Sequence, residues 1–338
     1  MTGFLRRRGR RGRTARRGRG IRAWLAAAAG AAVAAAGVTL AVVLPGPAGH
    51  APPRPAGDRF ALPATPASYL GWYPAGVPRS YAGVSAVSAA TGVKPALVPY
   101  YSGWFEPFQA SFAAAAARDG AVPIVQMNPD GIRVAAIASG RYDGYLRGYA
   151  GDVRAYHRPV IVSFGHEMNG GWYSWGYKRT SPAAFVAAWR HIVGLFRAAG
   201  ARNVTWLWTV NIIDDPHYGK IPSPARWWPG GKYVTWVGID GYYYHSSTAF
   251  SSLFGPTIAA VRQITGAPIL IAETAAVPAA GKPAKIADLF AGVRLYGLLG
   301  FVWFDVTHPE NWRLSSPEAL AAFRRGARDY RRPAPGAS

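Results

Sequence analysis

The chain has 338 residues, and its composition already excludes several kinds of protein chemistry. Half of the residues are hydrophobic, so a large core can form, and the length suits one large domain or two small ones. With no cysteine, the chain has no disulfide framework, no thiol nucleophile and no Cys-based zinc site. The formal net charge is +22, so the chain is strongly basic.

The N-terminus holds much of this charge, because residues 1–22 contain ten arginines and no acidic residue. A charge-free run of 22 residues follows, 23–44, which is long enough to span a bilayer with the arginines on its cytoplasmic side. The run is either a retained transmembrane anchor or the apolar part of a signal peptide cleaved near residues 46–51. Both alternatives predict export, so we expect an extracellular or membrane-anchored domain. A nucleic-acid-binding arm is disfavoured because the apolar run follows the arginines directly.

Residues 45–66 are dense in Pro, Ala and Gly and predict an extended linker. We expect one folded domain over 67–332 and a disordered tail over 333–338. After residue 22 the chain keeps 28 basic residues against 16 acidic ones, a balance that suits an acidic wall or membrane surface. We expect a monomer.

Eight short apolar runs within the domain predict strands. They are 69–74, 95–101, 122–128, 159–165, 204–210, 234–240, 268–274 and 300–306. Such continuous apolar runs indicate strands buried on both faces, and so a parallel sheet covered by helices.

The segments between these runs carry helix signals. Ser181 and Pro182 predict the start of one helix and Gly200 its end, and Ser316 and Pro317 predict the start of the last helix. Eight strand–helix units in this length match a (β/α)8 TIM barrel, which typically takes about 250 residues. A doubly wound open sheet is the alternative, but no Gly-rich phosphate loop follows the first strand.

Four carboxylates stand at or just after the ends of predicted strands, where barrel enzymes build their sites. They are Glu167, Asp240, Glu273 and Asp305. A buried carboxylate at such a position is costly unless it is partnered or functional. The two glutamates, with aromatic residues beside the first, are the stronger pair. The aromatics that end the second strand, Tyr100, Tyr101 and Trp104, either line a glycan cleft or cover the barrel rim.

At these residues the chain resembles glycoside hydrolase family 26, the β-mannanase family of retaining barrel glycosidases. The stretches that carry the resemblance are HEMNGGWYSWG (166–176), SGRYDGYLRGYA (139–150), WWPGGKYVTWVGIDGYYY (227–244) and IAETA (271–275).

The resemblance implies a role for each matching position. Glu167 corresponds to the general acid/base, Glu273 to the nucleophile and Tyr242 to the tyrosine that orients the nucleophile. The other positions implied to bind substrate are His166, Asn169, Trp172, Trp175 and Trp303. One position departs from the family pattern, since Ser163 stands where an arginine often precedes the acid/base by four residues.

Hydrolysis of a glycosidic bond generally requires two carboxyl groups, whatever the family of the enzyme. Glycoside cleavage needs one protonated carboxyl to protonate the leaving oxygen and one carboxylate to meet the oxocarbenium-like centre. We therefore expect an exported retaining endo-β-glycosidase acting on β-mannan or a related β-linked polysaccharide, with no cofactor and no metal. The alternative is a cell-surface glycan-binding barrel with weak or no turnover. The acidic and His-containing stretches 214–218 and 305–311 reflect turn chemistry, or else contact a metal or sugar hydroxyls.

Overall fold

The structure is a computed structural model that describes residues 60–328 and 330. The predicted segments 1–22, 23–44 and 333–338, and most of the predicted linker, lie outside the described residues. No helix in the described part of the chain has both the length and the apolar character that a membrane crossing requires.

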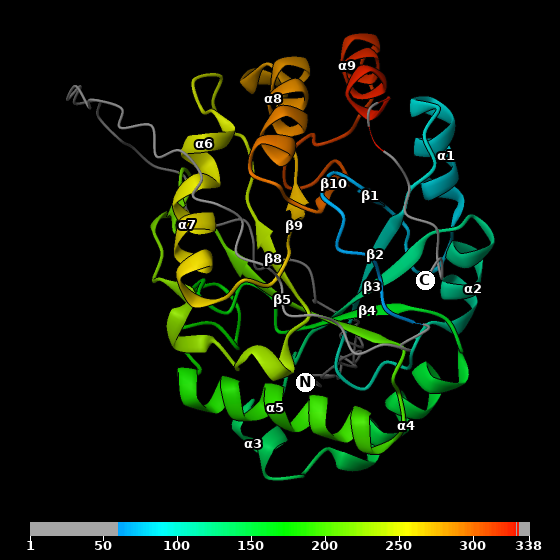
Figure 1. Cartoon of the computed structure of the whole chain (residues 1–338), viewed down its shortest axis with the longest axis vertical. Coiled ribbons are helices and arrows are strands. Elements are labelled where there is room, and N and C mark those ends of the chain that lie inside the picture. Colours follow the sequence, from blue (N-terminus) through cyan, green and yellow to red (C-terminus); the bar gives the residue numbers. More distant parts are fainter. Residues whose placement is uncertain (1–59, 329, 331–338) are drawn as a thin grey trace, which may run out of the picture. The chain divides into compact units, whose positions relative to one another are not determined.

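Eight parallel strands form a closed barrel in the order β1-β10-β9-β8-β5-β4-β3-β2, and helices surround them (Figure 1). The barrel strands are β1 (Tyr69–Pro74), β2 (Leu97–Ser102), β3 (Val122–Met127), β4 (Val160–Phe164), β5 (Val204–Asn211), β8 (Trp236–Asp240), β9 (Ile269–Thr274) and β10 (Gly300–Asp305). Each agrees with a predicted strand to within two residues at either end. The barrel expected from the sequence is therefore confirmed.

The described α-helices are α1 (Ala82–Thr91), α2 (Ala110–Arg118), α3 (Ala135–Ala138), α4 (Asp143–Ala155), α5 (Pro182–Ala198), α6 (Phe250–Leu253), α7 (Gly255–Ile264), α8 (Lys282–Leu295) and α9 (Pro317–Ala327). The predicted caps are confirmed in α5 and α9. The hydroxyl of Ser181 accepts a hydrogen bond from the Ala184 backbone N–H at 3.3 Å, and Ser316 does the same for Ala319 at 3.1 Å. Each cap satisfies one N–H that a helix start otherwise leaves without a partner.

One of the expected strand–helix units is different. Between β5 and β8 the chain forms a short hairpin, β6 (Asp214–Asp215) with β7 (Gly219–Lys220), and then 3₁₀ turns η2 (Pro224–Trp227) and η3 (Gly231–Tyr233) instead of an α-helix. A third 3₁₀ turn, η4 (Pro278–Ala280), precedes α8. Prolines and paired glycines in 222–231 interrupt any helical run, so the prediction of a helix after every strand was wrong at this place.

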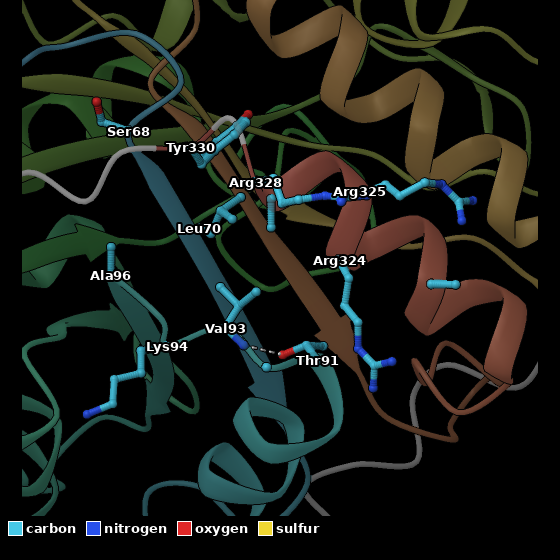
Figure 2. Close-up of a pocket in the computed structure, with 13 residues that line it drawn as sticks. Ser68, Leu70, Thr91, Val93, Lys94, Ala96, Arg324, Arg325, Arg328 and Tyr330 are labelled. Atoms are coloured by element: carbon cyan, nitrogen blue, oxygen red, sulfur yellow. Dashed lines mark hydrogen bonds between the residues drawn. The ribbon is translucent and has the colours of Figure 1, made fainter.

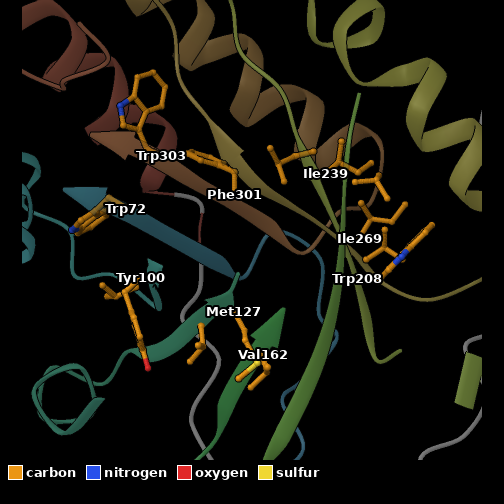
Figure 3. Close-up of a cluster of buried hydrophobic side chains, with 14 of the residues drawn as sticks. Trp72, Tyr100, Met127, Val162, Trp208, Ile239, Ile269, Phe301 and Trp303 are labelled. Atoms are coloured by element: carbon orange, nitrogen blue, oxygen red, sulfur yellow. The ribbon is translucent and has the colours of Figure 1, made fainter. Parts of the chain in front are cut away.

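The strands alternate between two hydrophobic layers. Side chains such as Leu207, Trp236 and Leu270 fill the barrel interior. Their neighbours point outward and pack beneath the helices, as Figure 3 shows for Val162, Trp208 and others. Burial on both faces explains why the strands read as continuous apolar runs.

The packed part of the chain begins slightly before the expected boundary at residue 67. Leu62 is 3% exposed and belongs to the interior cluster at the amino ends of the strands, and the Tyr69 hydroxyl donates to the Pro63 carbonyl at 2.8 Å. The last residues of the predicted linker therefore pack against the amino-terminal end of the barrel.

A hollow of about 730 Å³ opens at the amino ends of β1 and β2, between α1 and α9 (Figure 2). Its rim includes Lys94, Arg324, Arg325 and Arg328. The side chains of Lys94 and Arg324 lie on opposite sides of Val93 in Figure 2, so they do not converge on one ligand position. Both predicted catalytic glutamates belong to the opposite end of the strands.

Candidate active site

Glu273 faces the barrel interior because β9 is irregular. Strict alternation would turn Glu273 outward, since Ala272 lies in the interior cluster and Ile271 in the outer one. The register of β9 slips against both neighbouring strands just here, so that Glu273 pairs with Asp240 of β8 while the next residue pairs with Trp303 of β10. A bulge of this kind re-aims a side chain, and it delivers the carboxylate to the carboxyl-terminal mouth of the barrel.

Two phenols hold the Glu273 carboxylate. The Tyr242 hydroxyl donates to Oε2 at 2.8 Å, and the Tyr101 hydroxyl donates to Oε1. Burial raises the pKa of Glu273 to about 7, and the hydrogen bonds from Tyr101 and Tyr242 oppose that rise. Tyr242, the tyrosine expected to orient Glu273, thus contacts its carboxylate, and Tyr101 adds a second contact.

Glu167 lies on a left-handed backbone. Its φ is 53°, and Gly165, two residues earlier, has a φ of 55°. A non-glycine residue in this region costs about 1–3 kcal/mol and persists only where surrounding contacts fix it. Here the backbone N–H of Glu167 donates to the Thr209 carbonyl of β5 at 3.0 Å. The turn after β4 therefore fixes the direction in which this glutamate points.

Nitrogen donors hold both oxygens of Glu167. The Trp172 indole N–H donates to Oε2 at 2.8 Å, and the Asn211 amide donates to Oε1 at 2.9 Å. Burial, followed by the charge of Glu273, raises the pKa of Glu167 well above its ordinary value, and the two hydrogen bonds offset this only in part. Because the charge of Glu273 disfavours a second charge on Glu167, Glu273 is the carboxyl that ionises first and Glu167 the one that keeps its proton to higher pH.

His166 is a buried, neutral residue and not an exposed sugar ligand. It is 2% exposed, and burial lowers its pKa to about 3. Its Nδ1 lies 3.1 Å from Oδ1 of Asn128, and its Nε2 lies 3.1 Å from the Tyr173 hydroxyl. With Nδ1 protonated toward the amide oxygen, Nε2 accepts from the phenol. The imidazole thus fixes the Tyr173 hydroxyl near Glu167 and Glu273.

Two further residues predicted to bind substrate are buried supports. Asn169 is completely buried and exchanges hydrogen bonds with the Asn211 backbone, at 2.8 and 2.9 Å. Trp175 is 1% exposed and donates its indole N–H to the His166 carbonyl at 2.7 Å, while its ring stacks on Tyr173. As direct ligands both were predicted wrongly; they fix the residues that hold Glu167 and His166.

Trp303 is likewise a core residue, which corrects its prediction as a sugar-stacking residue. It is fully buried in the layer under the helices (Figure 3), and its indole donates to the Trp312 carbonyl at 2.8 Å. The next residue, Phe304, faces the barrel axis instead, where it stacks on Tyr73 with ring centroids 4.7 Å apart. Alternation along this strand would have selected Phe304, since Val302 points inward.

Trp172 alone among the predicted tryptophans keeps an accessible surface. It is partly exposed and stacks against Tyr218 of the β6–β7 hairpin, with ring centroids 4.5 Å apart. Tyr218 ends the stretch 214–218, which the sequence assigned to turn chemistry or to contacts with a metal or sugar hydroxyls, and the hairpin brings its ring beside Trp172.

Replacing Trp172 with phenylalanine tests the indole N–H. We expect the pKa of Glu167 to rise further, because one of the donors that lowers it is lost. The basic limb of the kcat/KM profile, which follows loss of the Glu167 proton, should move to higher pH. The measurement is that profile on a cleaved glycan. An unmoved or lowered basic limb would show that the indole does not tune Glu167.

The two aspartates at strand ends differ from each other. Asp240 is fully buried, and burial followed by the charges of Glu273 and Glu167 raises its pKa well above the ordinary value. The backbone N–H of Glu273 lies near it without forming a good hydrogen bond. Asp305 accepts from the Leu314 backbone N–H at 2.6 Å and is a loop support. Asp240 is thus a buried neighbour of Glu167 and Glu273 whose charged form is disfavoured.

Turn chemistry accounts for the acidic stretch at 214–218. Asp215 Oδ1 accepts from the backbone N–H groups of His217 and Tyr218, at 2.7 and 2.9 Å. Within residues 60–328 and 330, no three or more His, Asp and Glu side chains are grouped in a way that would suit a metal ion. The stretch therefore shapes the hairpin that carries Tyr218.

Comparison with known proteins agrees with this geometry. Residues 149–280 match the sequence model of glycosyl hydrolase family 26, a range that contains both glutamates. The resemblance to this family is confirmed. Endoglucanase H of Acetivibrio thermocellus is 31% identical over 266 residues, covering 74% of this chain and 29% of the relative. Mannan endo-1,4-beta-mannosidase A and B of Caldalkalibacillus mannanilyticus is 28% identical over 85 residues, covering 23% of this chain and 15% of the relative. The chain thus spans less than a third of either curated relative.

Solved structures share the fold. An endo-beta-1,4-mannanase double mutant of Cellulomonas fimi superposes with a TM-score of 0.62 at 16% identity, over 80% of this chain and 73% of the other. The catalytic domain of a Bacillus sp. JAMB-750 endo-beta-1,4-mannanase gives 0.61 at 17% identity, over 80% and 88%. At such identities the likeness concerns the barrel.

Proposed function

We propose that the chain is an endo-β-glycosidase that hydrolyses β-mannan or a related β-linked polysaccharide. The observation that carries this is the pair Glu167 and Glu273 at one barrel mouth. The charge of Glu273 raises the pKa of Glu167, and the two carboxyl groups have hydrogen-bond donors of different kinds. The family match and the mannanase and endoglucanase names of its relatives support the same class.

We infer a double-displacement mechanism with retention. Glu167, which keeps its proton to higher pH, protonates the leaving oxygen, while ionised Glu273 attacks the anomeric carbon and forms a glycosyl-enzyme. The departed sugar leaves Glu167 ionised, and it then removes a proton from the water that hydrolyses the intermediate. The environments described above support this division, since burial raises both pKa values and two phenols restrain that of Glu273.

The Ser163 position does not argue for an inactive barrel. Its hydroxyl is buried and lies 3.1 Å from the Thr209 hydroxyl, so the position where the resemblance implies an arginine holds a satisfied neutral pair. We therefore favour catalysis over the glycan-binding alternative. The proposed location is extracellular, with the barrel released or tethered, and it rests on the sequence of residues 1–44.

The deciding experiment is a reducing-sugar assay on mannans, xylans and mixed-linkage glucans. Turnover on one class with internal chain cleavage supports the proposal and names the substrate. If glycans bind but no polymer is cut, the binding alternative replaces it. Glu273→Gln, run beside the native protein, separates enzymatic release from contamination.

A further inference from the structure

We propose that Tyr101 is a positioning residue for Glu273, which it keeps ionised and oriented for attack through a hydrogen bond to the carboxylate oxygen that Tyr242 does not hold. The inference rests on the proposed function, because it assigns a task within that reaction.

The fold brings Tyr101 to Glu273 from β2, which β1 and β10 separate from β9 in the barrel. Tyr101 lies next to last on β2, while Glu273 lies on β9, and 172 positions separate them along the chain. The inward side of β2 places the phenol at the mouth. There its hydroxyl donates to Oε1 while the Tyr242 hydroxyl donates to Oε2. Each oxygen thus has its own phenol, and the carboxylate plane is fixed between β2 and the loop that follows β8.

Neighbouring rings fix the Tyr101 side chain. Its ring lies edge-on to Tyr73 with centroids 5.1 Å apart, and 5.4 Å from the His166 ring. The His166 ring is itself held at both nitrogens. The phenol is therefore presented in one orientation and needs no rearrangement to meet the carboxylate.

The chemistry of the donor matters as well as its place. A phenol is a more acidic donor than an indole or an amide, so it favours the ionised carboxylate more strongly. Glu273 has two phenols, whereas Glu167 has an indole and an amide. Burial penalises both charges, and among the opposing effects on the pKa of Glu273 the Tyr101 hydrogen bond is the larger. Tyr101 thus contributes to the difference that makes one glutamate the acid and the other the nucleophile.

Tyr101 is also distinct from its neighbour on the same strand. Tyr100 points to the other face of β2, where it is fully buried and its hydroxyl accepts from the Gln109 backbone N–H at 3.3 Å. Tyr100→Phe therefore removes a buried phenol from the same strand without touching Glu273, which makes it a matched control.

The test compares Tyr101→Phe and Tyr100→Phe in the full chain. The first readout is the pH profile of kcat/KM on the glycan that the panel identifies. The second is the titration of Glu273 in resting protein, followed by ¹³C NMR of δ-labelled glutamate and assigned with Glu273→Gln. We expect Tyr101→Phe to raise the pKa of Glu273, and with it the acidic limb, by about one unit, the size of a hydrogen bond to a charged group. Tyr100→Phe should leave both in place.

Each outcome has a distinct meaning. If the native protein cleaves glycans but Tyr101→Phe moves neither the limb nor the titration, the inference is wrong and the proposed function stands. If Tyr101→Phe moves the titration of Glu273 but the native protein cleaves no glycan, the hydrogen bond is confirmed. The proposed function then fails, and Tyr101 has no catalytic role to support. Should Tyr101→Phe not fold, 3-fluorotyrosine at position 101 keeps the ring and makes a stronger donor. It must then move the Glu273 titration to lower pH, and an unmoved titration overturns the proposal.

Discussion

Replacing Glu273 with alanine will lower turnover on every glycan substrate by on the order of 10⁴-fold or more, because no other group can form the glycosyl-enzyme. The loss should be the same for polysaccharides and for aryl glycosides, since a better leaving group does not replace a missing nucleophile. The measurement is kcat/KM on both substrate types.

The matched control is Glu318→Ala, which removes an exposed glutamate from the first turn of α9. Its activity should remain near that of the native protein. Added azide can enter the space left by the Glu273 side chain and attack the anomeric carbon directly. A single displacement then gives an α-azide from a β-substrate. A β-azide from Glu273→Ala, or residual activity within tenfold of the native protein, would contradict the assignment of the nucleophile.

The barrel was predictable because its signals are local. Runs buried on both faces identify the strands, and Ser-Pro pairs identify helix starts at Ser181 and Ser316, so neighbours in sequence suffice. The connection from β5 to β8 was not predictable in the same way. Its hairpin depends on backbone hydrogen bonds from His217 and Tyr218 to one aspartate, which composition alone does not distinguish from an ordinary loop.

The candidate site was predictable in its glutamates and less so in its surroundings. Glu167 and Glu273 stand out as carboxylates at strand ends, and the resemblance to a family selected them. Whether a neighbouring aromatic side chain faces the site depends on strand register. On β10, Phe304 faces the barrel axis and the predicted Trp303 is buried under the helices.

Contacts between distant strands of the barrel are still harder to predict from the sequence. The bond from Tyr101 to Glu273 joins β2 to β9, and no spacing along the chain encodes it. The bulge that turns Glu273 inward is also invisible in IAETA, because alternation alone would place this side chain outside. The closed sheet determines both features, because it sets which residues of distant strands meet at the barrel mouth.

Replacing Glu167 with alanine will produce a different failure. General acid catalysis contributes about 10²- to 10⁴-fold, so cleavage of polysaccharides should fall by that factor. An aryl β-glycoside whose leaving group needs no proton should still glycosylate Glu273 at nearly the native rate. The measurement is pre-steady-state release of the phenol, which should appear as a burst. After the burst the glycosyl-enzyme accumulates, because no base activates the water.

Azide separates the two glutamates. In Glu167→Ala it needs no deprotonation, so it should attack the accumulated glycosyl-enzyme from the face that water uses, restore steady turnover and yield a β-azide, since two inversions retain the configuration. The opposite anomers expected from the two variants make the assignment independent of absolute rates. Equal loss on activated and unactivated substrates, or an α-azide from Glu167→Ala, would exclude Glu167 as the acid/base. A burst without rescue would still support Glu167, because the burst alone shows that the first step has lost its need for an acid while the second has lost its base.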